Sequence, residues 1–301
     1  MFKGIFYGCL AGISYGTNPL GALHLYKEGL APDTVLCYRF TWAILMLAAV
    51  MFFNGKFFNG TPRSAREIFA VKSRDLRVIA ILGVLFAISA LTLFASFNYM
   101  DAGLASTLLF LYPLEVAVIM GLFFKEKLTP TTAVSIAISL AGISLLYKGG
   151  ENGIALNTTG LILVFLSSLS YAIYIVVVNR ANLKTGALKL TFYAMIFCLL
   201  SLLVYSTFLG SGFPAIPTNL NQWGWGAMLG LVPTVLSLVF MAKSVKIVGS
   251  TPTAITGALE PLTAVVIGVC IFGESLTLRL ITGIALILAS VLLIAVSKKH
   301  S

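Results

Sequence analysis

Ten stretches of about twenty mostly apolar residues dominate this 301-residue sequence. They lie near residues 3–24, 32–54, 77–99, 103–123, 129–148, 158–179, 188–209, 223–243, 250–272 and 277–297. A helix that crosses a bilayer needs about 20 such residues. A membrane strand alternates apolar and polar residues, and these stretches do not. We therefore predict an all-α membrane protein with ten transmembrane helices.

The composition excludes a water-soluble domain of this size. Apolar residues make up 59% of the chain and charged residues 10%, whereas a soluble domain has roughly 45–50% and about 25%. The one sizeable polar stretch, residues 54–77, is too short to form a domain. Any function is therefore expected within the membrane.

The net charge of +10 is distributed unevenly along the chain. If the N-terminus is cytoplasmic, 16 of the 20 Lys and Arg residues lie on the cytoplasmic side, at 3, 56–77, 125–127, 180–189, 243–246 and 298–299. Cytoplasmic loops carry such an excess. We therefore predict a protein integral to the plasma (inner) membrane with both termini cytoplasmic. The bases then orient the chain among membrane lipids, and no nucleic-acid partner is expected.

Two segments of the chain repeat each other. Pro113–Thr129 and Pro261–Thr277 are identical at eight of 17 positions, with a constant offset of 148 residues. The repeat divides the chain into residues 1–148 and 149–301, each with five predicted spans. Because five is odd, the second half should enter the membrane upside down. Inverted repeats of this kind are typical of secondary transporters.

With this duplicated arrangement, the chain resembles the drug/metabolite transporter superfamily, in particular its ten-span EamA-type exporters. Each half has an apolar span, a proline, about a dozen residues, Glu-x-Leu-Thr and a last span that contains glycine. The resemblance covers nearly the whole chain. It implies a central cavity formed by the first, third, fourth, sixth, eighth and ninth spans. It also implies the movement of small metabolites, commonly amino acids, by alternating access.

Two acids lie near the middle of predicted spans. Glu115 is in the fourth span and Glu260 in the ninth, where a carboxylate costs on the order of 2.5–3.5 kcal/mol on insertion scales. In the repeat, Glu260 corresponds to Tyr112 and Glu115 to Thr263, so the acids break the symmetry. We consider both as candidates for proton coupling. The alternative is a neutral acid that is hydrogen-bonded to a neighbouring helix.

Arg39, in the second span, has two interpretations. Its side chain could extend to the outer membrane surface, or it could pair with one of the two glutamates or with a substrate carboxylate, which suits a guanidinium well. The residue pattern leaves both open.

Further polar groups gather in other spans. Thr17, Asn18 and Pro19 predict a broken first helix, and the sixth span has a polar face, for which hydrogen bonding between helices is an equal alternative. The substrate-binding candidates are Tyr15, Asn18, Arg39, Tyr112, Glu115, Tyr171, Tyr174 and Glu260, with Thr234 and Ser237 as weaker ones. Glu126 and Glu274 are interpreted as residues of turns and helix starts.

The sequence thus favours a secondary transporter, an exporter of small metabolites with protons as a candidate coupling ion. An uncoupled facilitator and a non-transporting partner or sensor subunit are the alternatives. The chain contains neither a nucleotide-binding P-loop nor H-E-x-x-H nor C-x-x-C, so we expect no enzyme activity, cofactor or metal. The oligomeric state stays open.

Overall fold

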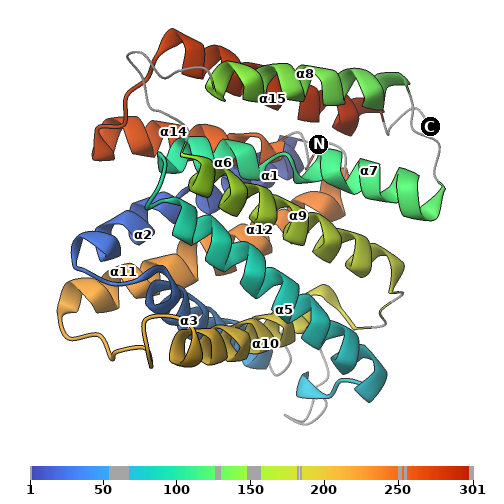
Figure 1. Cartoon of the computed structure of the whole chain (residues 1–301). Helices are drawn as coiled ribbons and strands as arrows, with labels where there is room; N and C mark the ends of the chain where they lie inside the picture. The colour runs from blue at the N-terminus through green and yellow to red at the C-terminus, as the bar shows by residue number, and fades with distance from the viewer. Residues whose placement is uncertain are drawn as a thin grey trace.

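The computed structural model describes residues 2–53, 68–125, 130–147, 157–181, 183, 185–249, 253 and 256–297, and in these residues the regular elements are all helices (Figure 1). The first half contains α1 (Phe2–Gly16), α2 (Asn18–Lys27), α3 (Pro32–Phe53), α5 (Ser73–Ser96), α6 (Ala102–Leu109), α7 (Tyr112–Phe124) and α8 (Pro130–Tyr147). The second half contains α9 (Thr158–Arg180), α10 (Ala187–Phe208), α11 (Leu220–Gly230), the π-helix η2 (Leu231–Leu236), α12 (Ser237–Val248), α14 (Leu259–Phe272) and α15 (Leu278–Ser297).

The chain is an all-helical membrane protein. Among the described residues, six segments are long and apolar enough to cross a membrane: Pro32–Phe53, Ser73–Ser96, Ala102–Phe124, Thr158–Arg180, Ala187–Phe208 and Leu220–Val248. Three shorter apolar helices are Pro130–Ile143, Leu259–Phe272 and Leu278–Leu293.

Several helices are interrupted near a proline. The first predicted span is broken between α1 and α2 at Thr17, two residues before Pro19, as the sequence predicts. A second break separates α6 from α7 just before Pro113, and the turn around Pro233 is π-helical. Proline lacks a backbone N–H and its ring clashes with the preceding turn, so it interrupts the regular hydrogen-bond pattern.

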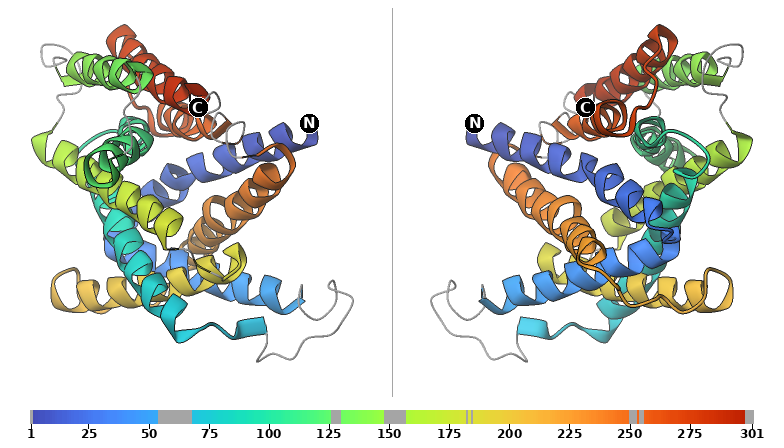
Figure 2. Two further views of the ribbon diagram at one scale, coloured as in Figure 1. Left: turned by 90° about the vertical axis from the view of Figure 1, so that its right-hand side faces the viewer. Right: turned by 90° about the vertical axis from the view of Figure 1, so that its left-hand side faces the viewer.

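α1 packs between α12 and α14 along a stripe of glycines. Gly4, Gly8, Gly12 and Gly16 recur every four residues and are all buried. A Cβ at Gly4 would come within 2.5 Å of Val248, and one at Gly16 within 2.6 Å of Thr263. The absence of side chains thus allows a close approach of helices, and Figure 2 shows the first turn of α1 beside the end of α12.

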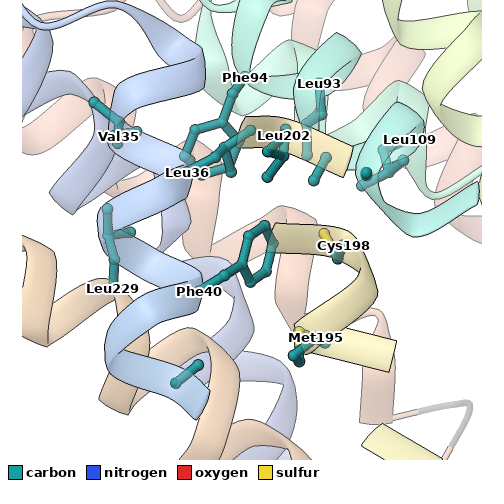
Figure 3. Close-up of a cluster of buried hydrophobic side chains, with 14 of the residues drawn as sticks. Val35, Leu36, Phe40, Leu93, Phe94, Leu109, Met195, Cys198, Leu202 and Leu229 are labelled. Atoms are coloured by element: carbon teal, nitrogen blue, oxygen red, sulfur yellow. The ribbon is translucent and has the colours of Figure 1, made fainter. Parts of the chain in front are cut away.

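The largest cluster of buried apolar side chains joins α3 to α5, α6, α10 and α11. Phe40 of α3 is fully buried and lies among side chains of these helices (Figure 3). Leu36, Phe94, Leu202 and Leu229 are also fully or almost fully buried there. The cluster fixes the part of α3 that carries Arg39.

α8 and α15 pack against each other along one edge of the molecule (Figure 1). The hydroxyls of Ser139 and Ser290 are hydrogen-bonded between them. A Cβ at Gly142 would come within 2.9 Å of Ile287, so this pair is also in close contact.

Candidate functional site

A cavity of about 320 Å³ lies between the helices of the two halves. Its wall takes residues from α1, α3, α5, α6, α7, α9, α10, η2, α12 and α14. Of the eight substrate-binding candidates, six line it: Tyr15, Arg39, Tyr112, Tyr171, Tyr174 and Glu260.

The cavity extends towards the end of the bundle at which α1 begins. Met241 and Val245 line it on α12 and are 44% and 41% exposed. They approach the end of α12 at Val248, which contacts Gly4. Arg39, which also lines the cavity, is only 2% exposed. The lining therefore includes both exposed side chains of α12 and a buried cation.

The side chain of Arg39 is held inside the protein. Its Nε–H donates a hydrogen bond to Oγ1 of Thr234 at 3.0 Å, and the Thr234 hydroxyl donates to the carbonyl oxygen of Leu229 at 2.9 Å. The guanidinium carbon lies 5.9 Å from the centroid of the Tyr15 ring, within the range of a cation–π contact. Extension to the membrane surface is therefore wrong for Arg39. The one hydroxyl proton of Thr234 is used on Leu229, so its oxygen accepts from Arg39.

Glu260 brings a carboxyl group to the same cavity. It lies in the first turn of α14 and lines the cavity together with Arg39. Tyr15 lines the cavity as well, with its ring in cation–π range of the Arg39 guanidinium. A buried charge needs compensation, and a guanidinium and a carboxyl group in one cavity offer a donor and an acceptor to a ligand.

Aromatic rings form another part of the lining. The rings of Tyr112 and Tyr171 meet nearly at right angles with centroids 4.7 Å apart. Tyr171 and Tyr174 are stacked at 5.7 Å, and Phe86 lies 5.7 Å from Tyr174. These rings offer apolar surface with a few hydroxyls, which suits the apolar part of a ligand.

Glu115 and Asn18 do not line this cavity. Glu115 accepts a hydrogen bond from the hydroxyl of Ser168 on α9, which is the alternative that the sequence left open. The Asn18 side chain donates to the carbonyl oxygen of Tyr15 at 2.9 Å. Within the described part of the chain, its Oδ1 atom is buried without a hydrogen-bond partner. Asn18 thus supports the break between α1 and α2.

Other lining residues were weak or absent candidates in the sequence. Thr234 and Ser237 both line the cavity, as do Phe86 and Thr191. Phe86 lies 148 residues before Thr234, so extending the repeat offset would have found it. By contrast, Ser167 donates to the carbonyl oxygen of Ser89 at 2.7 Å, an interhelical bond.

The opposite end of the bundle is closed by Glu274. Its carboxylate accepts hydrogen bonds from the backbone N–H groups of Ala102 at 2.7 Å and Gly103 at 3.3 Å. It thus caps the N-terminus of α6, where a negative charge is favoured. A Cβ at Gly268 would collide with this carboxylate. The sequence predicts a local turn role for Glu274, and this is incomplete because its carboxylate also binds a distant helix. Glu126, for which the same role is predicted, lies outside the described residues.

Asp101 lies beside this cap. Its Oδ2 atom is buried with no hydrogen-bond partner among the described residues. Burial raises the pKa of Asp101. Burial also raises the pKa of Glu274, against the lowering effect of its backbone hydrogen bonds and with a further rise from the charge of Asp101. This end of the protein therefore holds two carboxyls that resist ionisation.

Aromatic side chains complete the closed end. The ring of His24 stacks on Trp225 with centroids 4.2 Å apart and meets the edge of Phe272 at 5.2 Å. The ammonium of Lys27 lies 5.0 Å from the centroid of Phe272. Residues of α2, α11 and α14 are in contact here.

Comparison with known proteins places this arrangement in a family. The chain is 30% identical over 223 residues to an uncharacterized transporter of Archaeoglobus fulgidus, which covers 73% of this chain and 77% of the relative. It is 22% identical to the uncharacterized inner membrane transporter YicL of Salmonella typhimurium, over 99% of this chain and 97% of the relative. One crystal structure has a TM-score of 0.62 at 18% identity and covers 96% of this chain and 97% of that one, which supports the fold. The model of the EamA-like transporter family matches residues 2–148 and 158–296, so the chain belongs to the EamA-like transporter family.

Proposed function

We propose that this chain is a secondary transporter that exports small metabolites such as amino acids. The observation that carries the proposal is a cavity inside a membrane protein that is lined by the buried Arg39 and by Glu260. Ionisable groups at this depth are costly and mark substrate and ion pathways. A guanidinium holds a carboxylate, a carboxyl group holds an ammonium, and the tyrosines contact the apolar part. An amino acid presents all three.

The proposed mechanism is alternating access between two inverted five-helix halves, residues 1–148 and 149–301, with ten spans. The packing of the helices supports this. In the proposed repeat, α1 corresponds to α9, α3 to α10, and α5 to α11 together with α12. When each helix is exchanged for its partner, the contact α1–α12 becomes α9–α5 and the contact α3–α11 becomes α10–α5. The pairs α8–α15, α3–α10 and α6–α14 map onto themselves. The backbone is left-handed at both Lys125 and Gly273, which are 148 residues apart.

The orientation follows from the basic residues. With both termini cytoplasmic in the inner membrane, the exposed end of the cavity at Met241 and Val245 faces the cytoplasm. The closed end, with the Glu274 cap, then faces outwards. This is a state that loads substrate from the cytoplasm, and export requires the Glu274 end to open in turn. Proline breaks in the cavity wall provide the hinges.

Of the two mid-span acids, we assign proton coupling to Glu260. It lines the cavity with Arg39, whereas Glu115 is hydrogen-bonded to Ser168 elsewhere. A proton on Glu260 and a substrate ammonium would compete for the same carboxyl group. The alternative is an uncoupled facilitator, which has the same cavity and no response to a pH gradient. Neither enzyme activity nor a sensor role is needed to account for the site.

The proposal is tested on purified full-length protein. A thermal-shift screen of amino acids, amines and carboxylates should identify ligands, because a ligand that binds only the folded state raises the unfolding temperature. Counterflow of the best ligand into proteoliposomes then measures transport. We expect saturable flux that a pH gradient accelerates. Stabilisation without any flux would favour a sensor, and flux that ignores the gradient would favour the facilitator.

A further inference from the structure

A second cavity lies on the side of the bundle, away from the site described above. It encloses about 300 Å³ between α6, α8 and α9. Its lining is Leu108, Leu111, Ile143, Leu161, Ile162, Val164, Phe165 and Ser168. None of these residues lines the central cavity.

The side cavity faces the hydrocarbon of the membrane. Ile162 and Phe165 are 61% and 58% exposed, and both lie in the membrane-spanning segment Thr158–Arg180. At 1.5 Å per residue, Ile162 lies ~6 Å and Ser168 ~15 Å along α9 from its start. The cavity therefore reaches from near one membrane surface towards the middle of the bilayer.

The chemistry of the lining excludes polar occupants. Seven of its eight side chains are hydrocarbon, and the hydroxyl proton of the eighth, Ser168, is donated to Glu115. Water is stable in a cavity only where it finds two to four polar partners. An empty space of this size would deprive its lining of dispersion contacts. A flexible hydrocarbon chain from the surrounding bilayer needs no polar partners and restores the dispersion contacts of the lining.

We propose that the cavity between α6, α8 and α9 is a specific binding site for one acyl chain of a membrane lipid. The chain enters past Ile162 and Phe165, and its end packs against the Ser168 side chain that holds Glu115. The site is independent of the transported substrate. Only the side chain of Ser168 then separates the bound lipid chain from Glu115.

The test uses full-length protein in phosphatidylcholine vesicles that contain a phosphatidylcholine with a photoreactive diazirine in its acyl chain. After irradiation, mass spectrometry maps the adducts. Leu200 and Val204 on α10 are 51% and 60% exposed and serve as a matched lipid-facing reference. At each fraction of probe we expect more adducts on residues 161–168 than on the α10 reference, because a chain held in a cavity is surrounded by lining side chains. Adducts on the α10 reference should rise in proportion to the probe.

A pair of variants tests the cavity itself. Leu161→Trp fills it, and Leu200→Trp adds the same bulk on the reference face. The first should lower the adducts on residues 161–168 about tenfold, and the second should leave them unchanged. Should Leu161→Trp not fold, the ratio of adducts on residues 161–168 to those on α10 in the unmodified chain decides alone. Labelling equal to that of α10, or adducts that persist in a folded Leu161→Trp, would overturn the proposal. A disulfide-linked dimer of an Ile162→Cys variant would overturn the proposal and assign the cavity to a second copy of the chain.

Discussion

The two walls of the central cavity come from equivalent places in the two proposed repeats but differ in chemistry. One wall has Tyr15, Arg39, Thr234 and Glu260. Their counterparts in the proposed repeat are Tyr171, Thr191, Phe86 and Tyr112, if the offset is allowed to lengthen from 148 residues to 152 at Arg39 and 156 at Tyr15. The tyrosine is common to both walls. At the other three positions, Arg39 pairs with Thr191, Thr234 with Phe86, and Glu260 with Tyr112. If the halves are repeats as proposed, equivalent positions contribute charged groups on one side of the repeat and aromatic groups on the other.

The contacts behind the walls have changed much less. The hydroxyl of Ser237 donates to the carbonyl oxygen of Ala11, at 3.1 Å. In the other half, the hydroxyl of Ser167 donates to the carbonyl oxygen of Ser89, at 2.7 Å. Ser89 and Ser237 are 148 residues apart, and Ala11 and Ser167 are equivalent in the alignment of Tyr15 with Tyr171. Packing contacts are therefore shared where cavity residues diverge, which separates scaffold from specificity.

The largest expected effect comes from the charged wall. Arg39→Lys keeps the charge but loses the planar fork that binds a carboxylate. Affinity for a carboxylate ligand should fall about ten- to hundredfold, the range for a hydrogen bond to a charged group. Ligand-induced thermal shift and counterflow both measure it. Thr191→Val, at the equivalent place in the aromatic wall, is the control and should change affinity little. Equal losses in both variants would contradict the distinction between the walls.

The second prediction separates the two mid-span acids. Glu260→Gln should abolish the acceleration of flux by a pH gradient, because an amide does not take up a proton in this range. Glu115→Gln should keep it, since Glu115 lies outside the cavity lining. Both variants preserve side-chain volume, and flux with and without the gradient is the measurement. A Glu115→Gln protein that loses its pH response would move the coupling site to Ser168 and Glu115.

Thr234 provides a smaller effect. Thr234→Val removes the oxygen that accepts the Nε–H of Arg39, so the guanidinium loses its fixed orientation. Ligand affinity should fall about tenfold, and Thr234→Ser should restore it. Phe86→Leu changes the counterpart in the other wall without touching Arg39. If Thr234→Val and Thr234→Ser have the same ligand affinity, Thr234 does not position the guanidinium through its hydroxyl.

The smallest effect is expected at the closed end, where Asp101 from one half meets Glu274 from the other. Because the folded state raises both pKa values, the contribution of these two carboxyls to stability is fully present below the ordinary carboxyl range of about pH 4 and is lost as pH rises through the raised values. Asp101→Asn should reduce this dependence of the unfolding temperature between pH 4 and 7. Glu28→Gln removes another carboxyl at the same end and is the control. An unchanged pH profile in Asp101→Asn would show that Asp101 does not contribute.

The sequence predicted the membrane class, the helical content and the break at Thr17, because these follow from hydropathy and proline over short stretches. It also selected six of the residues that line the cavity, since a polar group in an apolar span draws attention. It left open whether Arg39 extends outwards, because that choice depends on Thr234, 195 residues away. Glu115 was selected by the same criterion as Glu260, and only the position of Ser168 distinguishes them.

The Glu274 cap was missed for a related reason. A glutamate after a helix and before a Leu-Thr pair predicts a local role. Its partners, the N–H groups of Ala102 and Gly103, belong to a helix more than 170 residues earlier. Every residue except proline has a backbone N–H group, so the sequence does not show which of them donates to a side chain. The glycine at 268 is the one sequence signal, since a side chain there would exclude the carboxylate.

The glycine stripe of α1 has a consequence for the order in which the protein assembles. Each glycine in a helix costs roughly 0.5–1 kcal/mol relative to alanine, so α1 is a weak helix by itself. The neighbours that hold it, α12 and α14, begin at Ser237 and Leu259. These neighbours follow α1 by more than 200 residues in the chain. The packing of its glycine face is therefore a late step in assembly.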